Sequence, residues 1–193
     1  MGRPKQFDPD EAAQEAMEAF WERGYAATSV NDLLDEMGLN KGSLYGTFGD
    51  KKQLFLAALE KYSDQRTCAA ADILEQKIPA RKVLEALLDC IARDCTGENA
   101  HRGCLAAKAA MELAPHDKDV AAWLKKYHRR NVQMVARVIE RGQKEGDVSR
   151  KLDATAAARF FLNNFAGMRL LGTTNPSISE LKEVAELVLK VLD

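Results

Sequence analysis

Side chains suited to contacts with nucleic acid are concentrated between residues 40 and 51. This stretch reads NKGSLYGTFGDK and combines two lysines with three hydroxyl groups and three glycines. Lysine and hydroxyl groups can reach phosphate oxygens or base edges, and glycine permits close approach of the backbone. Tyr45 suits a phosphate better than a base. The candidate DNA contacts in this stretch are Lys41, Gly42, Ser43, Tyr45 and Thr47.

A short basic arm stands at the N-terminus. Residues 2–5 read GRPK, and a cationic tail stiffened by proline suits the narrow minor groove of DNA. An ordinary disordered terminus has the same composition, so this interpretation depends on a DNA-binding module following directly. Because such a module is expected here, Arg3 and Lys5 join the candidate DNA contacts.

Cysteine chemistry provides a separate hypothesis. The four cysteines are too scattered for a disulfide framework, and free thiols are expected. A helix starting at Cys104 would lower the pKa of its thiol, which makes Cys104 a candidate sensor of oxidants or electrophiles. A metal site from Cys90, Cys95, His101 and Cys104 is disfavoured because no C-x-x-C pair is present. Buried structural cysteine is the simpler alternative, and no metal or other cofactor is expected.

The sequence lacks the common catalytic signatures. It has no P-loop, no G-x-S-x-G elbow, no H-E-x-x-H helix and no dinucleotide-binding glycine pattern. Its three histidines are scattered, so an enzyme is not expected. An all-helical module that binds another protein is the alternative to DNA binding, but it would leave Lys41, Tyr45 and Lys51 without a purpose.

The elements that must position the candidate DNA contacts are short helices. A first helix is expected over residues 9–23, with Asp8 as N-cap and Gly24 as terminator. A second is expected over 30–37, begun by Thr28 or Ser29, and a third over 41–48. Gly38 supplies the tight turn between these two. The spacing is that of a helix-turn-helix, whose second helix enters the major groove.

Residues 28–55, TSVNDLLDEMGLNKGSLYGTFGDKKQLF, closely resemble the DNA-binding domain of the TetR family. The aromatic pair Phe20-Trp21 and the glycine turn that follows extend this likeness across the first three expected helices. The resemblance implies a transcriptional regulator. It also implies that Lys51 holds a backbone phosphate, with Thr28 and Tyr45 flanking it as hydroxyl contacts.

The rest of the chain continues with apolar residues at helical spacing and needs no strand. We therefore expect an all-α fold of about nine helices, with a three-helix head and a larger helical body. The head, residues 1–52, is assigned to DNA binding together with the basic arm. Residues 53–193 are assigned to effector binding and dimerisation.

A two-fold dimer is expected because an operator-binding helix-turn-helix usually pairs two half-sites roughly 34 to 36 Å apart. The last two expected helices carry wide apolar stripes, and the resemblance implies a four-helix interface built from this pair in each subunit. The alternative is that the stripes face the intrachain core. The residues chosen for the interface are Gly167, Leu171, Leu181, Val184 and Val188.

A pocket for an unknown small-molecule effector is expected between the middle helices. Methionine and aromatic side chains there mix adaptable apolar surface with a few polar groups. Core packing is the alternative for each residue, because apolar side chains at helical spacing are more often core than ligand contacts. The candidate residues are Met111, Trp123, Tyr127, Phe161, Asn164, Phe165 and Met168.

Composition fits this hypothesis without selecting it. The 193 residues are 46% apolar and 30% charged with a net charge of −1, as in ordinary globular proteins. The sequence contains no long apolar run, so a cytoplasmic protein without a membrane partner is expected. The hypothesis is a homodimeric repressor on an inverted-repeat operator, released when an effector favours a conformer of different spacing. Activation instead of repression stays open.

Overall fold

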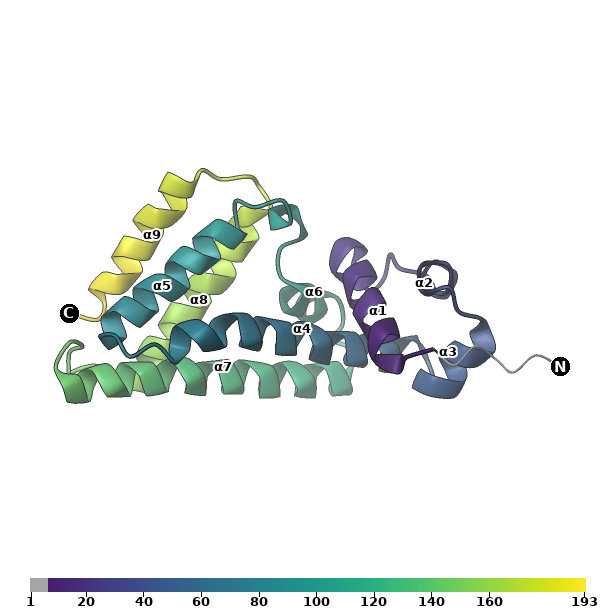
Figure 1. Ribbon diagram of the computed structural model, residues 1–193, viewed down its shortest axis with the longest axis horizontal. Helices are drawn as coiled ribbons and strands as arrows, with labels where there is room; N and C mark the ends of the chain where they lie inside the picture. Colours follow the sequence, from purple (N-terminus) through teal and green to yellow (C-terminus); the bar gives the residue numbers. More distant parts are fainter. Residues whose placement is uncertain (1–6) are drawn as a thin grey trace. The chain divides into compact units, whose positions relative to one another are not determined.

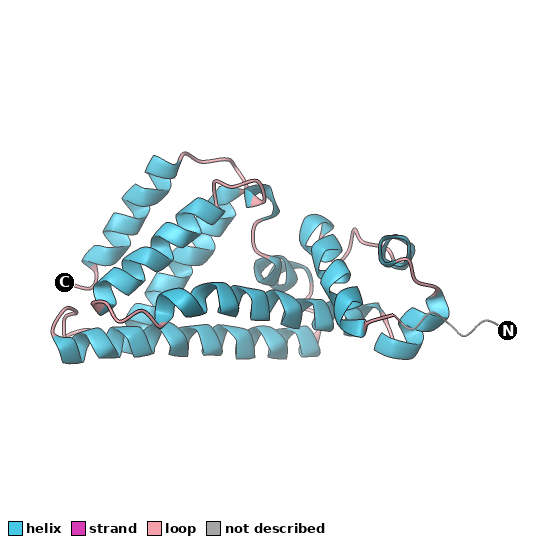
Figure 2. Cartoon of the chain, in the orientation of Figure 1, coloured by secondary structure: helices cyan, strands magenta, loops and turns pink. Residues whose placement is uncertain are grey.

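The computed structural model describes residues 7–193, and helices connected by loops make up this part of the chain (Figures 1 and 2). The expected all-α class is confirmed, with nine α-helices and one short 3₁₀ helix among the described residues. The elements are α1 (Pro9–Arg23), α2 (Val30–Met37), α3 (Lys41–Phe48), α4 (Lys51–Leu74), α5 (Ala80–Asp94), η1 (Ala100–Arg102), α6 (Leu105–Glu112), α7 (Lys118–Glu145), α8 (Ala154–Gly172) and α9 (Ile178–Lys190).

The ends of the first three helices coincide with those expected from the sequence, because their capping residues act locally. The Asp8 carboxylate accepts a hydrogen bond from the Asp10 amide at 2.8 Å, and Gly24 ends α1 with a φ of 85°. Ser29 begins α2 through a capping box with Asp32. A side-chain acceptor at such a position satisfies an amide that has no partner within the helix.

The described residues divide into two compact units. One comprises the chain up to Arg66 together with Leu105–Leu124, and the other comprises Thr67–Cys104 with Lys125–Asp193. The divisions therefore fall inside α4 and inside α7. This division is one of packing, whereas the expected boundary between residues 52 and 53 concerned function and stays a prediction.

The first unit is built on an aromatic cluster. Phe20 and Tyr25 both pack against Phe55, with ring centroids 4.9 Å apart in each case. Trp21 meets Tyr62 edge to face at 5.4 Å. Phe20, Phe55 and Tyr62 are essentially inaccessible to solvent. These rings pack α1 against the first half of α4.

The second unit has its core between α5, α8 and α9, which pack against one another (Figure 1). Leu84, Leu88 and Phe161 are buried there. The C-terminal half of α7 also contributes, and its Gly142 is tightly surrounded. A Cβ at Gly142 would lie 2.5 Å from the Val148 side chain, so this approach requires glycine. Over the described residues, no helix has the length and apolar character to cross a membrane.

Candidate nucleic-acid interface

The helix-turn-helix forms as the sequence predicts. Gly38 adopts the left-handed conformation, with φ 60° and ψ 29°, and turns the chain sharply between α2 and α3. Asn40 begins α3, since its side-chain oxygen accepts a hydrogen bond from the Ser43 amide at 2.9 Å. Glycine reaches the left-handed region without the steric cost that a Cβ imposes. The turn residues thus fix where the second helix begins.

The polar residues of α3 share its solvent-exposed surface. Leu44 is fully buried and attaches the helix to the unit beneath it, and Ser43 is half-buried beside it. Tyr45 is 44% exposed, which is high for an aromatic residue. The remaining exposed candidates on this helix are Lys41, Gly42 and Thr47.

Lys51, at the start of α4, is half-buried and engaged within the chain. Its Nζ donates to the Tyr25 carbonyl at 2.6 Å and lies 4.1 Å from the centroid of the Tyr25 ring. Burial lowers the pKa of Lys51, while the negative charges of Glu112 and Asp32 act in the opposite direction. An ammonium group has three N–H donors, so the bond to Tyr25 leaves donors for another acceptor. Its contact with phosphate stays a prediction.

Thr28 has a different environment from the one expected of a DNA contact. The residue is fully buried, and its Oγ1 donates to the Gly24 carbonyl at 2.7 Å. A hydroxyl enclosed by its own chain cannot reach a phosphate in this conformation. The assignment of Thr28 as a hydroxyl contact is therefore corrected: the side chain closes the turn between α1 and α2. Arg3 and Lys5 lie outside the described residues.

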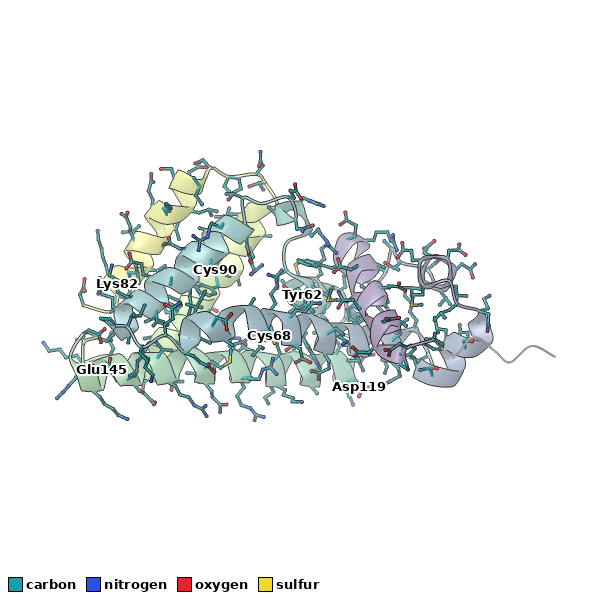
Figure 3. All side chains as sticks on the ribbon, viewed as in Figure 1. Tyr62, Cys68, Lys82, Cys90, Asp119 and Glu145 are labelled. Carbon is teal, nitrogen blue, oxygen red and sulfur yellow. The ribbon has the colours of Figure 1, made fainter. Side chains whose placement is uncertain are left out.

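No pattern in the sequence indicated a group of charged residues on α6 and α7 that contact α1, the turn after it and the start of α4. Lys108 of α6 donates a hydrogen bond to the Trp21 carbonyl near the end of α1, and Glu112 of α6 accepts one from the Ala26 amide in the turn that follows. Lys52 donates to Asp119 at 2.7 Å, at the N-terminal end of α7 where Figure 3 labels the aspartate. Lys52 and Asp119 are 67 residues apart, and no local pattern signals such pairs.

The residues predicted for the dimer interface differ in how far the chain itself buries them. Leu181 and Val188 are 1% and 2% exposed and lie in the core between α5, α8 and α9. Their assignment to the interface was wrong, because a side chain covered by its own chain cannot meet a partner. Val184 is half-buried, whereas Gly167 and Leu171 are exposed. Other exposed apolar side chains lie on α8, on α9 or directly after α9 but were not among the residues chosen for the interface, namely Phe160, Leu170, Ile178, Leu187 and Val191.

The predicted effector residues are divided between the two compact units. Met111 and Trp123 belong to the first compact unit, and Met111 is 72% exposed. Phe161 and Met168 are each 1% exposed in the core of the second unit, where Phe161 packs against Phe165 with ring centroids 5.0 Å apart. The same unit contains Tyr127 and Asn164, both half-buried. A shared pocket stays a prediction.

The four cysteines are free thiols, as expected. Figure 3 labels Cys68 on α4 and Cys90 on α5. Cys104 is half-buried and directly precedes α6, so the expected position at a helix start is correct, but its redox role is a prediction. Across residues 7–193, no three His, Cys, Asp or Glu side chains gather as potential metal ligands.

Two family models match the chain. A model described as bacterial regulatory proteins, tetR family, matches residues 14–58. A second, described as tetracyclin repressor-like, C-terminal domain, matches residues 80–179. The first match contains α2 and α3 in full, and the second extends from the start of α5 to the start of α9.

Characterised and uncharacterised relatives align over nearly the whole chain. The HTH-type transcriptional repressor ComR of Escherichia coli (strain K12) is 31% identical over 98% of this chain and 91% of its own. The HTH-type transcriptional regulator YezE of Bacillus subtilis (strain 168) is 26% identical over 100% of both chains.

A solved structure has the same arrangement of elements. It is a cysteine mutant of the TetR family transcriptional regulator CifR, complexed with a 26-base-pair double-strand operator DNA. The two chains are 30% identical, align over 100% of each and superpose with a TM-score of 0.88. The likeness therefore includes both compact units and extends well beyond the helix-turn-helix.

Proposed function

This chain belongs to the TetR family of bacterial transcriptional regulators, and we propose that it represses transcription by binding an operator in duplex DNA through α3. The observation that carries the proposal is the exposed polar surface of α3, held by buried Leu44 and set by the turn at Gly38. The full-length likeness to ComR, named a repressor, supports repression over activation. The likeness to CifR bound to operator DNA supports a duplex as the partner.

In the proposed complex α3 lies in the major groove. Lys41 and Thr47 are at opposite ends of this eight-residue helix, so they can reach different points along the groove. Tyr45 and Lys51 contact phosphate oxygens, which sets the register of the helix without reading sequence. Ser43 and Gly42 complete the surface near the start of the helix, and Arg3 and Lys5 enter the adjacent minor groove.

The proposed active form is a homodimer assembled through α8 and α9. These helices carry exposed apolar side chains on the second compact unit, including Leu170 at 66% and Leu187 at 61% exposure. Several large, exposed apolar side chains on neighbouring helices are typical of a protein interface. Gly167 and Leu171 share the exposed surface of α8 with Leu170. The operator would then be an inverted repeat.

A small molecule that binds the body is proposed to release the dimer from DNA. Such a ligand acts only if it binds one conformer more tightly than the other. Because α4 and α7 run without interruption from one compact unit into the other, both helices can transmit the change. The predicted pocket residues are the starting set for locating the effector. As a regulator of transcription, the protein would act in the cytoplasm of a bacterial cell.

The test is selection of duplexes from a random-sequence pool with the purified protein, followed by affinity measurements on the enriched site at increasing salt. An enriched inverted repeat with a steep salt dependence is expected, since phosphate contacts release counterions. Lys41→Gln should reduce the salt slope by about one ion. Recovery of no duplex at low salt would contradict the proposal and favour a protein-interaction module.

A further inference from the structure

Two charged side chains of α6 hold the end of α1 and the turn that follows it. Lys108 Nζ donates to the carbonyls of Trp21 at 2.7 Å and Glu22 at 3.1 Å. Glu112 Oε2 accepts a hydrogen bond from the Ala26 amide at 3.0 Å. All of these residues belong to the first compact unit. Lys108 and Glu112 are four residues apart, so they lie on the same face of α6.

The contact made by Lys108 matches the electrostatics of a helix end. The last carbonyl groups of a helix have no intrahelical partners and carry partial negative charge. Lys108 supplies a positive charge and hydrogen-bond donors to two of them. Lys108 is only half-buried, which keeps the cost of removing its charge from water moderate. The end of α1 is therefore capped by a cation from another helix.

Gly24 makes the approach of Glu112 possible. Its φ of +85° lies in the region that favours glycine, and an added Cβ would be 2.4 Å from Glu112 Oε1. The backbone conformation favours glycine at this position, and a Cβ would displace the Glu112 carboxylate from its place against the turn. The carboxylate consequently lies directly against the backbone of the turn and bonds to its Ala26 amide.

The turn passes this constraint on to α2. Residues 25–29 separate Gly24 from α2, and the Thr28 hydroxyl closes them onto the Gly24 carbonyl. Lys51 donates to the Tyr25 carbonyl from the start of α4. A segment this short with hydrogen bonds at Tyr25, Ala26 and Thr28 has little freedom to change the direction in which α2 begins.

We propose that Lys108 and Glu112 are positioning residues for operator recognition. By holding the turn between α1 and α2, they set the direction of α2 and, through the tight turn at Gly38, the orientation of α3. This inference rests on the proposed function, because the orientation of α3 matters only if α3 reads DNA. Neither side chain contacts DNA itself; both act through the turn.

The experiment compares three variants of the full chain with the parent. Lys108→Met removes the charge and keeps most of the stem, and Glu112→Gln keeps an acceptor for the Ala26 amide. Lys118→Met is the matched control, since this exposed lysine of α7 lies in the same compact unit and loses the same charge. The measurements are affinity for the selected operator, affinity for a scrambled duplex of equal length, and amide hydrogen exchange of the free proteins.

Lys108→Met is expected to weaken operator binding about tenfold, as for the loss of one charge-assisted contact, while binding to scrambled DNA changes less than about twofold. Exchange should rise in the turn and in α2 and α3, but not in α5 or α9. Glu112→Gln should have a smaller effect of the same kind, and Lys118→Met should leave operator binding unchanged.

Three results would overturn the proposal. One is operator binding by Lys108→Met within about twofold of the parent, and another is an equal loss on scrambled DNA, which indicates a general charge effect. Faster exchange confined to the turn also contradicts it, because α2 and α3 would then not depend on α6. Failure of the proposed function is distinguishable, since the parent chain itself would then select no duplex.

Discussion

At the scale of single residues, the hydroxyl side chains of Thr28 and Tyr45 have opposite environments. The Tyr45 ring is 44% exposed on α3, whereas Thr28 is fully buried with its hydroxyl bonded to the Gly24 carbonyl. A buried hydroxyl stabilises the fold only while its partner is present. An exposed one contributes little to folding and is available to a ligand. We therefore expect Thr28 to stabilise the fold and Tyr45 to contact DNA, although the sequence suggested a DNA contact for both.

Replacing Tyr45 by phenylalanine should weaken operator binding and leave folding unchanged. The loss expected from one missing phosphate hydrogen bond is about three- to tenfold in Kd. Because Tyr45→Phe keeps the ring, the melting temperature should stay that of the parent. Titration of a fluorescent operator measures the first effect and thermal unfolding measures the second. An unchanged Kd would remove Tyr45 from the proposed interface.

Replacing Thr28 by valine should have the reverse pattern. Valine keeps the shape but cannot donate to the Gly24 carbonyl, so the free energy of unfolding should fall by about 1 to 3 kcal/mol. Operator affinity, measured where the variant is fully folded, should change less than about threefold. Thr28→Ser is the control, since it retains the donor. A large loss of affinity in a fully folded Thr28→Val protein would restore Thr28 as a DNA contact.

At the scale of elements, several helices begin with capping side chains that accept hydrogen bonds from backbone amides. Asn40 caps α3, and the pairs Ser29–Asp32 and Ser177–Glu180 form capping boxes at α2 and α9. Helix α3 has eight residues, of which only Leu44 is fully buried, so its stability depends largely on local contacts. Short helices gain little from propensity alone, which makes each cap important.

Removal of the Asn40 cap should weaken α3 specifically. Asn40→Ala leaves the Ser43 amide without its acceptor and should cost about 1 kcal/mol. Hydrogen exchange should quicken in residues 41–48 and remain unchanged in α9. Asn40→Asp keeps an acceptor and serves as the control. If exchange in α3 were the same in Asn40→Ala and the parent, the cap would not contribute to the helix.

Acid should weaken α2 and α9 together. The Ser29 hydroxyl lowers the pKa of Asp32, and the Ser177 amide lowers the pKa of Glu180. A carboxylate with a lowered folded-state pKa stabilises the protein above its unfolded pKa, and this contribution is lost as pH falls through the folded value. Stability should therefore decline below about pH 4. The decline should be shallower in Asp32→Asn and Glu180→Gln when unfolding is followed against pH.

At the scale of the whole molecule, the proposed binding to an inverted repeat would require a second copy of the chain. The exposed apolar side chains on α8 and α9 provide the surface proposed for that contact, with Leu187 61% exposed and Leu170 66% exposed. A stable interface must cover roughly 1,000 Å² or more. Two half-sites bound by one dimer raise the effective concentration of each head at its site, which makes dimerisation a condition of tight binding.

Leu187→Glu should prevent the proposed dimer from forming while the subunit remains folded. A charge at an exposed position costs the isolated chain little, but it would be buried against an apolar partner. Sedimentation should show a monomer, and operator affinity should fall by at least about a hundredfold. Leu181→Ala is the comparison: this buried side chain should instead reduce unfolding stability by about 2 to 5 kcal/mol. A dimeric Leu187→Glu protein would place the interface elsewhere.

The sequence by itself determined the features that local interactions decide. The ends of α1, α2 and α3 follow from caps and glycines within a few residues of each end, so they were predicted correctly. The DNA-binding motif was recognisable because its turn, its buried leucine and its polar surface lie within one continuous stretch. Periodicity of 3.6 residues sufficed for the all-α class.

Only the tertiary structure decided which residues far apart in the sequence contact these helices and which side chains are buried. The bond from Glu112 to Ala26 spans 86 residues, and no spacing in the sequence could indicate it. Burial separated Thr28 from Tyr45, and it placed Leu181 in the core while Leu187 remained exposed. The physical reason is the same in each case. A side chain's chemistry is written in its type, but its access to a partner depends on what the folded chain packs against it.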